Sequence, residues 1–313
     1  MNQIPYTTFI RPGIVHFMAF PACLKGEGPI LETLDHLLAE SRLEVIELGW
    51  IKDRSVLAEA KARCATAAVE IAAAAQPRLL VQQLDLNHPE STERFRAVDE
   101  MKRAVDDAVA LGSPSLAFLS GAWRGEEDLP GALDRLHESI TAIATHAPDD
   151  LALTMEIFDR HVDKKCLLGP APECAAFAER VRADVPRFGL MADLSHLPLL
   201  DETPAQGLRP VAPYLAHIHI GNAFTADRND PAWGDQHPRF GYPGSFNSVK
   251  ELTEFLQELF HVGYLDAGGT KRAAVSFEVK PVGNEESRLL LTGSLRTLDA
   301  AWRGVQLPSC ILS

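Results

Sequence analysis

The sequence predicts a single (β/α)8 barrel, an α/β fold in which eight parallel strands alternate with helices. Eight short apolar runs are separated by longer segments, several of which have helical periodicity. The runs lack the polar-apolar alternation of half-exposed strands, which favours strands covered on both faces. A length of 313 residues suits one such barrel, so we expect residues 1–313 to form one domain.

The predicted elements follow in order along the chain. Strands are expected at residues 13–20 (GIVHFMAF), 44–49, 78–83 (RLLVQQ), 115–121, 151–158, 188–194, 215–220 and 273–279. Helical segments are expected at 56–75, 92–112 and 249–264, with a C-terminal helix from about 286 to 302. The longest connection, 221–246, follows the seventh strand and contains Trp233 and Tyr242 among its aromatic residues. An ordered βα loop that contacts substrate or another subunit is therefore expected there.

Composition and charge exclude some partners. The net charge of −13 disfavours nucleic acid and anionic membranes. The five cysteines are scattered and odd in number, which favours free thiols in a reducing compartment. No basic segment followed by an apolar one opens the chain, and the apolar run at 13–20 is too short to span a bilayer. We expect a cytoplasmic protein.

Four ionisable residues lie at the ends of the last four predicted strands. They are Glu156, Asp193, His219 and Glu278. The carboxyl ends of barrel strands meet on one face, so these side chains are expected to converge there. His217 and His219 share the inward face of their strand, and His219 is the better ligand because it lies nearer that end.

Three carboxylates and one imidazole form a donor set for a hard or borderline divalent cation. Mn²⁺ is the expected cofactor, with Mg²⁺, Co²⁺ and Zn²⁺ as alternatives. A single strand-end carboxylate is more often a helix cap or an ion-pair partner. Four ionisable groups gathered inside a barrel require pairing or a metal ion, which favours the metal site.

Several motifs resemble the xylose-isomerase-like TIM-barrel superfamily, which includes sugar isomerases, ketose 3-epimerases, inosose dehydratases and a DNA-repair endonuclease. The motifs are Asp193-Leu-Ser-His196, His217-Ile-His219, Tyr242-Pro-Gly244 and His261-Val-Gly-Tyr264, together with Glu156 and Glu278. The resemblance implies that Glu156, Asp193, His219 and Glu278 bind the metal and that the two glutamates move protons. It also implies that His196 contacts substrate, and it matches Arg160 to an arginine of the epimerases.

The chain departs from the ketose epimerases at two places. Val162 stands where those enzymes have a further glutamate, and residues 221–225 lack their substrate-binding arginine. Strings such as GLMADLSHLPLL, GDQHPRFGYPG and VSFEVKP are similar to the catalytic subunits of bacterial C-glycoside deglycosidases. That resemblance implies a lyase acting on 3-oxo-glucosides, a small second subunit and a hetero-oligomer.

The expected chemistry begins with proton removal next to a sugar carbonyl, which gives an enediolate. Return of the proton gives an epimer or an isomer, whereas loss of a β-substituent makes the enzyme a lyase. We expect the lyase, a carbon–carbon lyase that expels the aglycone of a 3-oxo-glucoside, with Glu156 or Glu278 as the base. His196 and His237 are candidates for proton transfer or substrate contact, although a loop histidine such as His237 often has a structural role. Residues expected to bind substrate are Glu47, Gln83, Arg160 and Arg239.

Three alternatives remain open from the sequence. The protein could be a sugar isomerase or a ketose 3-epimerase that acts alone. It could be a DNA-repair nuclease, which the acidic charge disfavours. It could be a non-catalytic subunit that retains a metal.

Overall fold

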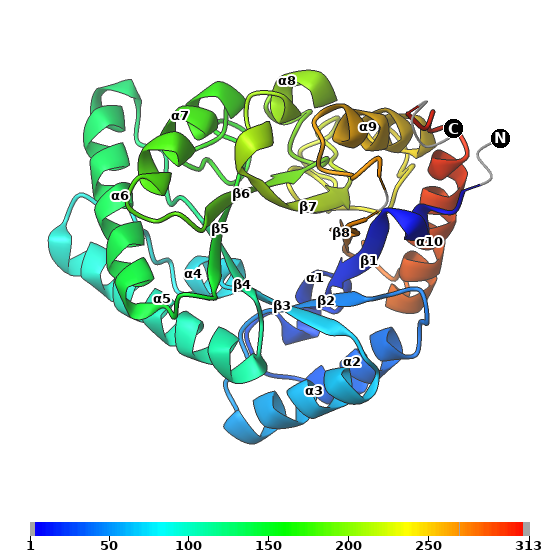
Figure 1. Cartoon of the computed structure of the whole chain (residues 1–313), viewed down its shortest axis with the longest axis horizontal. Coiled ribbons are helices and arrows are strands. Elements are labelled where there is room, and N and C mark those ends of the chain that lie inside the picture. The colour runs from blue at the N-terminus through cyan, green and yellow to red at the C-terminus, as the bar shows by residue number, and fades with distance from the viewer. Residues whose placement is uncertain (1–3, 269, 309–313) are drawn as a thin grey trace.

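Eight parallel strands close into a barrel in which every strand pairs with its neighbour in sequence and β8 pairs with β1 (Figure 1). This computed structural model describes residues 4–268 and 270–308. The strands are β1 (Ile10–Val15), β2 (Val45–Leu48), β3 (Glu70–Ala74), β4 (Ser115–Leu119), β5 (Ala152–Glu156), β6 (Phe188–Asp193), β7 (Leu215–Gly221) and β8 (Ala273–Glu278). The predicted (β/α)8 barrel is thus confirmed.

An outer ring of helices covers the barrel (Figure 1). The ring contains α2 (Ile30–Leu38), α3 (Arg54–Thr66), α5 (Ser91–Leu111), α6 (Leu129–His146), α7 (Ala171–Arg182), α8 (Pro204–Leu208), α9 (Val249–His261) and α10 (Ser287–Trp302). Two further short helices, α1 (His16–Ala19) and α4 (Gln76–Val81), follow β1 and β3. No helix among the described residues combines the length and the apolar character needed to cross a membrane.

The third strand lies earlier than the sequence predicted. The segment Glu70–Ala74 forms β3, whereas most of RLLVQQ belongs to α4, which has a proline in its first turn. Alanine favours helices, so 56–75 resembles one helix. The helix instead ends at Thr66, and Ala68 takes a left-handed conformation (φ 55°) that turns the chain into the strand. Pairing with β2 and β4 then overrides the helical propensity.

The first strand also differs from its prediction, because it begins at Ile10 and ends at Val15. His16 therefore opens α1 instead of continuing the strand. The imidazole is buried and its Nε2 lies 2.8 Å from Thr33 Oγ1. His16 is thus a buried core residue.

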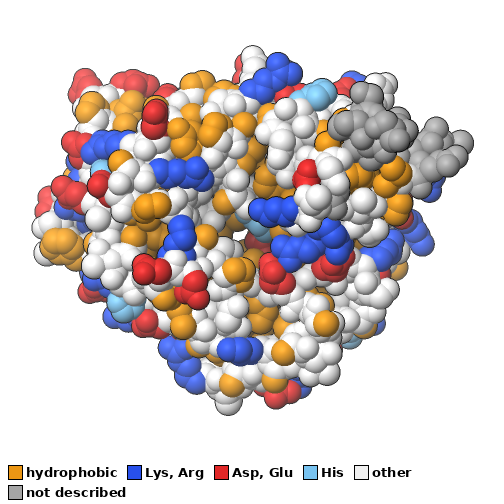
Figure 2. All heavy atoms as spheres, viewed as in Figure 1, with side chains coloured by type: hydrophobic (Ala, Val, Ile, Leu, Met, Phe, Trp, Pro, Cys, Tyr) orange, Lys and Arg blue, Asp and Glu red, His pale blue; other side chains and the backbone are white. Residues whose placement is uncertain are grey.

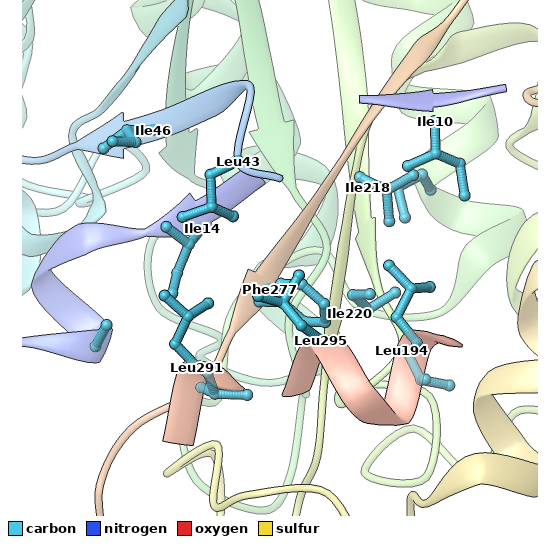
Figure 3. Close-up of a cluster of buried hydrophobic side chains, with 14 of the residues drawn as sticks. Ile10, Ile14, Leu43, Ile46, Leu194, Ile218, Ile220, Phe277, Leu291 and Leu295 are labelled. Atoms are coloured by element: carbon cyan, nitrogen blue, oxygen red, sulfur yellow. The ribbon is translucent and has the colours of Figure 1, made fainter. Parts of the chain in front are cut away.

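The main apolar core lies between the barrel and its helices. Outward-facing side chains of neighbouring strands, such as Ile14, Ile218 and Phe277, pack against Leu291 and Leu295 of α10 (Figure 3). These side chains are almost completely buried. Because the strands are buried on both faces, each appears in the sequence as a run of apolar residues.

The inside of the barrel is lined by small residues near its N-terminal mouth. Ala72, Ala152 and Ala274 line a cavity of about 510 Å³ that reaches His217. Arg11 and Glu70 form an ion pair of 2.8 Å beside it. Figure 2 shows this face hollowed near its centre, with charged side chains around the opening.

Candidate metal centre

The four strand-end residues converge at the C-terminal end of the barrel. One ligand atom each from Glu156, Asp193, His219 and Glu278 can be chosen so that all lie within 4.8 Å of one another. His219 Nδ1 lies 2.6 Å from Glu278 Oε2, 3.6 Å from Glu156 Oε1 and 4.0 Å from Asp193 Oδ2. Parallel pairing places Asp193 opposite His219, and Glu156 and Glu278 lie two positions or fewer from that level on the flanking strands, so each strand delivers its ligand near the same end of the barrel.

The cluster fits a cation on a structural criterion. Glu156 Oε1 and Asp193 Oδ2 are buried and have no hydrogen-bond partner among the described residues. Buried carboxylate oxygens without partners carry a large desolvation cost, which a divalent cation would offset. Oxygen donors with one imidazole suit Mn²⁺, Mg²⁺ or Co²⁺.

The ionisable groups of this cluster change one another's pKa values. Burial raises the pKa of Glu278, and Glu156 adds to the rise, while His237 and His219 oppose it. Burial also raises the pKa of Asp193, but His196, His237 and His219 outweigh it and leave the pKa below its usual range. A bound cation would favour deprotonation of all these groups.

Glu47, at β2, fixes the orientation of His219. Its carboxylate lies 3.0 Å from His219 Nε2 and 2.6 Å from His217 Nε2. With Nε2 hydrogen-bonded to Glu47, Nδ1 of His219 faces the cluster. A carboxylate behind a ligating imidazole sets its tautomer and strengthens its basicity. Glu47, expected to bind substrate, therefore contacts His219, one of the four candidate metal ligands. It also lines the adjoining cavity.

The buried carboxylate of Asp235 joins His196 and His237, the two histidines predicted to transfer protons or contact substrate. His196 Nε2 and His237 Nε2 lie 3.0 and 2.8 Å from the same oxygen, Asp235 Oδ1. His196 Nδ1 donates to the backbone oxygen of Ile157 at 2.7 Å. His237 Nδ1 is buried and without a hydrogen-bond partner among the described residues. His237 lines the cavity and His196 does not, so the two histidines occupy different places.

Gln76 is a site residue that sequence reasoning missed. Its Nε2 donates to Glu156 Oε2 at 2.7 Å from the first turn of α4. The sequence placed a strand at 78–83, so this glutamine had no reason to be considered. Gln83, proposed as the end of that strand, is instead exposed in a left-handed turn (φ 55°) outside the cavity.

Comparison with known proteins identifies the family. A family model described as "Xylose isomerase-like TIM barrel" matches residues 37–281, more than three quarters of the chain.

The chain belongs to the xylose isomerase-like TIM barrel family.

Solved structures with this fold include several sugar epimerases. D-Psicose 3-epimerase from Clostridium cellulolyticum H10 is 16% identical, with 95% of this chain and 100% of that chain covered and a TM-score of 0.68. L-Ribulose 3-epimerase is 17% identical, with 94% and 96% covered and a TM-score of 0.67. The 3-keto-D-glucoside 4-epimerase of E. coli is 15% identical, with 93% and 99% covered and a TM-score of 0.62. At these identities the likeness shows the fold.

Two arginines expected to bind substrate lie elsewhere in this member of the xylose isomerase-like family. Arg160 Nη2 is 2.7 Å from Glu173, and the guanidinium lies 4.3 Å from the centre of the Trp123 ring. Arg239 is 44% exposed at its side chain and pairs with Glu285 at 3.0 Å. Neither lines the cavity at the metal cluster, because local ion pairs direct both side chains away from it.

The cavity beside the four candidate metal ligands has both polar and apolar lining residues. Glu47, Glu156, His219, His237 and Glu278 contribute the polar side, and the apolar side is formed by Phe17, Met18, Leu24, Ala74, Pro77, Leu80 and Phe158. Its volume is about 70 Å³, well below the several hundred Å³ of most ligand sites. A ligand that needs several hundred Å³ would therefore fit only if part of this lining moved outward.

Proposed function

We propose that the protein is a divalent-metal-dependent enzyme of the sugar isomerase and epimerase type, acting next to the carbonyl of a keto sugar. One observation carries the proposal: four ligand-type side chains, two with unpartnered oxygens, converge at the C-terminal end of the barrel, where Glu156, His219 and Glu278 line a cavity. In this fold the catalytic groups lie at that end. The epimerase names of the similar structures agree with this chemistry.

The roles follow from position. Glu156, Asp193, His219 and Glu278 would hold the cation, which, when bound, would polarise a carbonyl and acidify the neighbouring C–H. Glu156 and Glu278 line the cavity and are the candidates to accept and return the proton. Gln76 holds one oxygen of Glu156, which leaves the unpartnered Oε1 free for the cluster. His237 lines the same cavity and has an unpartnered Nδ1, and it is the candidate proton donor to a substrate oxygen.

Deuterium exchange tests this function. The protein, stripped of metal and reloaded with Mn²⁺, Mg²⁺ or Co²⁺, is incubated in D₂O with a panel of ketohexoses, ketopentoses and 3-oxo-glucosides. NMR should show deuterium entering the carbon next to the carbonyl only in metal-loaded samples, and Glu156→Gln should abolish it. Full exchange activity in metal-free protein would overturn the proposal.

A second candidate function is elimination of the aglycone from a 3-oxo-glucoside. The apolar side of the cavity favours it, because Met18, Leu24 and Leu80 offer an aromatic group a surface that a free sugar does not need. One of the enzymes of similar structure is named as a 3-keto-D-glucoside 4-epimerase, so its substrate is of this type. This candidate includes the small second subunit that the deglycosidase resemblance implies.

The two candidates give different products. The protein is assayed alone and with the product of a neighbouring gene, on 3-oxo-glucosides with aromatic aglycones. Release of the aglycone supports the lyase, whereas epimerised or isomerised glycoside without release supports the first candidate. Chromatography of the two proteins together reports whether they associate.

A further inference from the structure

The cavity at the metal cluster has a cationic side chain with no role so far. Among the described residues that line it, Lys164 is the one lysine or arginine. The carboxylates of Glu47, Glu156, Asp235 and Glu278 line the same cavity. Lys164 lies in the loop after β5, eight positions beyond the end of that strand at Glu156.

Two carboxylates hold the Lys164 loop in place. The fully buried carboxylate of Asp159 accepts the backbone N–H groups of Val162, Asp163 and Lys164 at 2.7, 2.9 and 2.8 Å. Asp163 Oδ2 accepts the backbone N–H of Asp235 at 2.9 Å, which joins this loop to the loop after β7. The lysine is thus positioned before any substrate arrives.

The ammonium group has hydrogen-bonding capacity to spare. Lys164 Nζ lies 2.8 Å from Asp235 Oδ2 and donates to the Asp235 backbone oxygen at 3.3 Å. Asp163 Oδ2, at 3.6 Å, is beyond hydrogen-bond length. An ammonium has three N–H groups, so one is left for another acceptor. The side chain is 21% exposed, which leaves it accessible.

Lys164 stays charged in this setting. Burial lowers the pKa of Lys164, but the carboxylates of Asp235 and Asp163 outweigh it and raise the pKa above its usual value. The group therefore acts as a hydrogen-bond donor at neutral pH and not as a base.

We propose that Lys164 is a substrate-binding residue that donates a hydrogen bond to one oxygen of the sugar, a hydroxyl or the carbonyl. The proposal rests on the proposed function and deepens it. A fixed cationic donor requires an oxygen at one position of the sugar, and it favours any form in which that oxygen gains negative charge. Lys164 would thereby supply a contact that Arg160, held by Glu173 and Trp123, does not make.

The test compares Lys164→Met with Lys280→Met. Lys280 is a matched control because it carries the same charge in the loop after β8 and donates to Gln236 Oε1 at 2.6 Å, but it does not line the cavity. Both variants and the wild type are measured on the preferred keto sugar and on its monodeoxy analogues. Metal content and the unfolding midpoint are measured in parallel.

We expect Lys164→Met to lower kcat/KM about 10- to 100-fold, the range for a lost hydrogen bond to a charged group. Lys280→Met should stay within about twofold of the wild type, as expected for a charge outside the cavity. One deoxy analogue should be poor for the wild type by a similar factor, and Lys164→Met should lose little more on that analogue, since the partner oxygen is already gone. Lys164→Arg should restore part of the loss on the parent sugar.

Other results would overturn the proposal. If every analogue loses the same factor in the wild type and in Lys164→Met, Lys164 serves only to neutralise Asp235. If no sugar is turned over, the proposed function fails, and calorimetry of the same sugars with metal-loaded wild type and Lys164→Met still tests the contact. Equal affinity of the two proteins, or no binding by either, counts against Lys164.

Discussion

At the scale of single residues, the site depends on groups behind the ligands. Glu47 contacts both histidines of β7, and Gln76 contacts Glu156. The four candidate ligands were predictable because a strand end fixes where a side chain goes. Gln76, Lys164 and Asp235 were not, because loops and a short helix carry them. The course of the loop that carries Lys164 is set by hydrogen bonds from its backbone to the buried Asp159, which no apolar periodicity reveals. Asp235 belongs to the string GDQHPRFGYPG, but an aspartate in a loop has many ordinary roles, so the string does not assign one to it.

Replacing Glu47 tests the residue scale. Glu47→Gln keeps the size but removes the charge that holds His219 in its tautomer, so the affinity for Mn²⁺ should fall about 10- to 100-fold. Competition with a metal-binding dye measures it. The control is Glu70→Gln, which changes the residue paired with Arg11 at the N-terminal mouth of the barrel. It should leave the affinity for Mn²⁺ unchanged. Equal affinity in Glu47→Gln would show that Glu47 does not support the ligand.

At the scale of elements, close contacts between strands inside the barrel hold the site strands together. A Cβ on Gly13 of β1 would lie 2.3 Å from Ser276 Oγ on β8 and 3.0 Å from Val45 Cβ on β2. Strands β1, β2 and β8 can therefore approach only because residue 13 lacks a side chain. The existence and order of strands were predictable from apolar runs. The identity of β3 was not, since alanine alone does not distinguish a strand from a helix.

Gly13→Ala tests this packing. The extra methyl should force β1 away from its neighbours and lower the free energy of unfolding by about 1–3 kcal/mol. Denaturation by urea measures it. Gly13→Ala combined with Ser276→Gly should recover part of the loss, because the nearest atom is then gone. Full stability of Gly13→Ala alone would contradict the argument.

At the scale of the whole molecule, buried ion pairs make stability depend on pH. Burial lowers the pKa of His237, but Asp235 and Glu278 outweigh it and raise the pKa to about 9. The folded protein therefore binds this proton more tightly than the unfolded chain, whose histidines titrate near 6.5. This contribution to stability is fully present below about pH 6.5 and is lost as the pH rises through about 9.

Unfolding of the metal-free protein across pH 6 to 10 checks that direction. The midpoint temperature of unfolding should decrease as the pH rises from about 6.5 to 9. In His237→Gln this decrease should be smaller. His146→Gln is the control, because His146 is an exposed histidine paired with Asp106. A midpoint that rises over this range would contradict the assignment.

The hollow N-terminal mouth gives the molecule two faces with separate solvent access. The cavity at the N-terminal end reaches His217, which hydrogen-bonds to Glu47 and so lies two contacts from the ligand cluster at the C-terminal end. A reagent specific for imidazoles should therefore label His217 at the same rate whether or not a sugar occupies the site. His217 would thus report on the ligand cluster from the N-terminal end while the C-terminal cavity is in use.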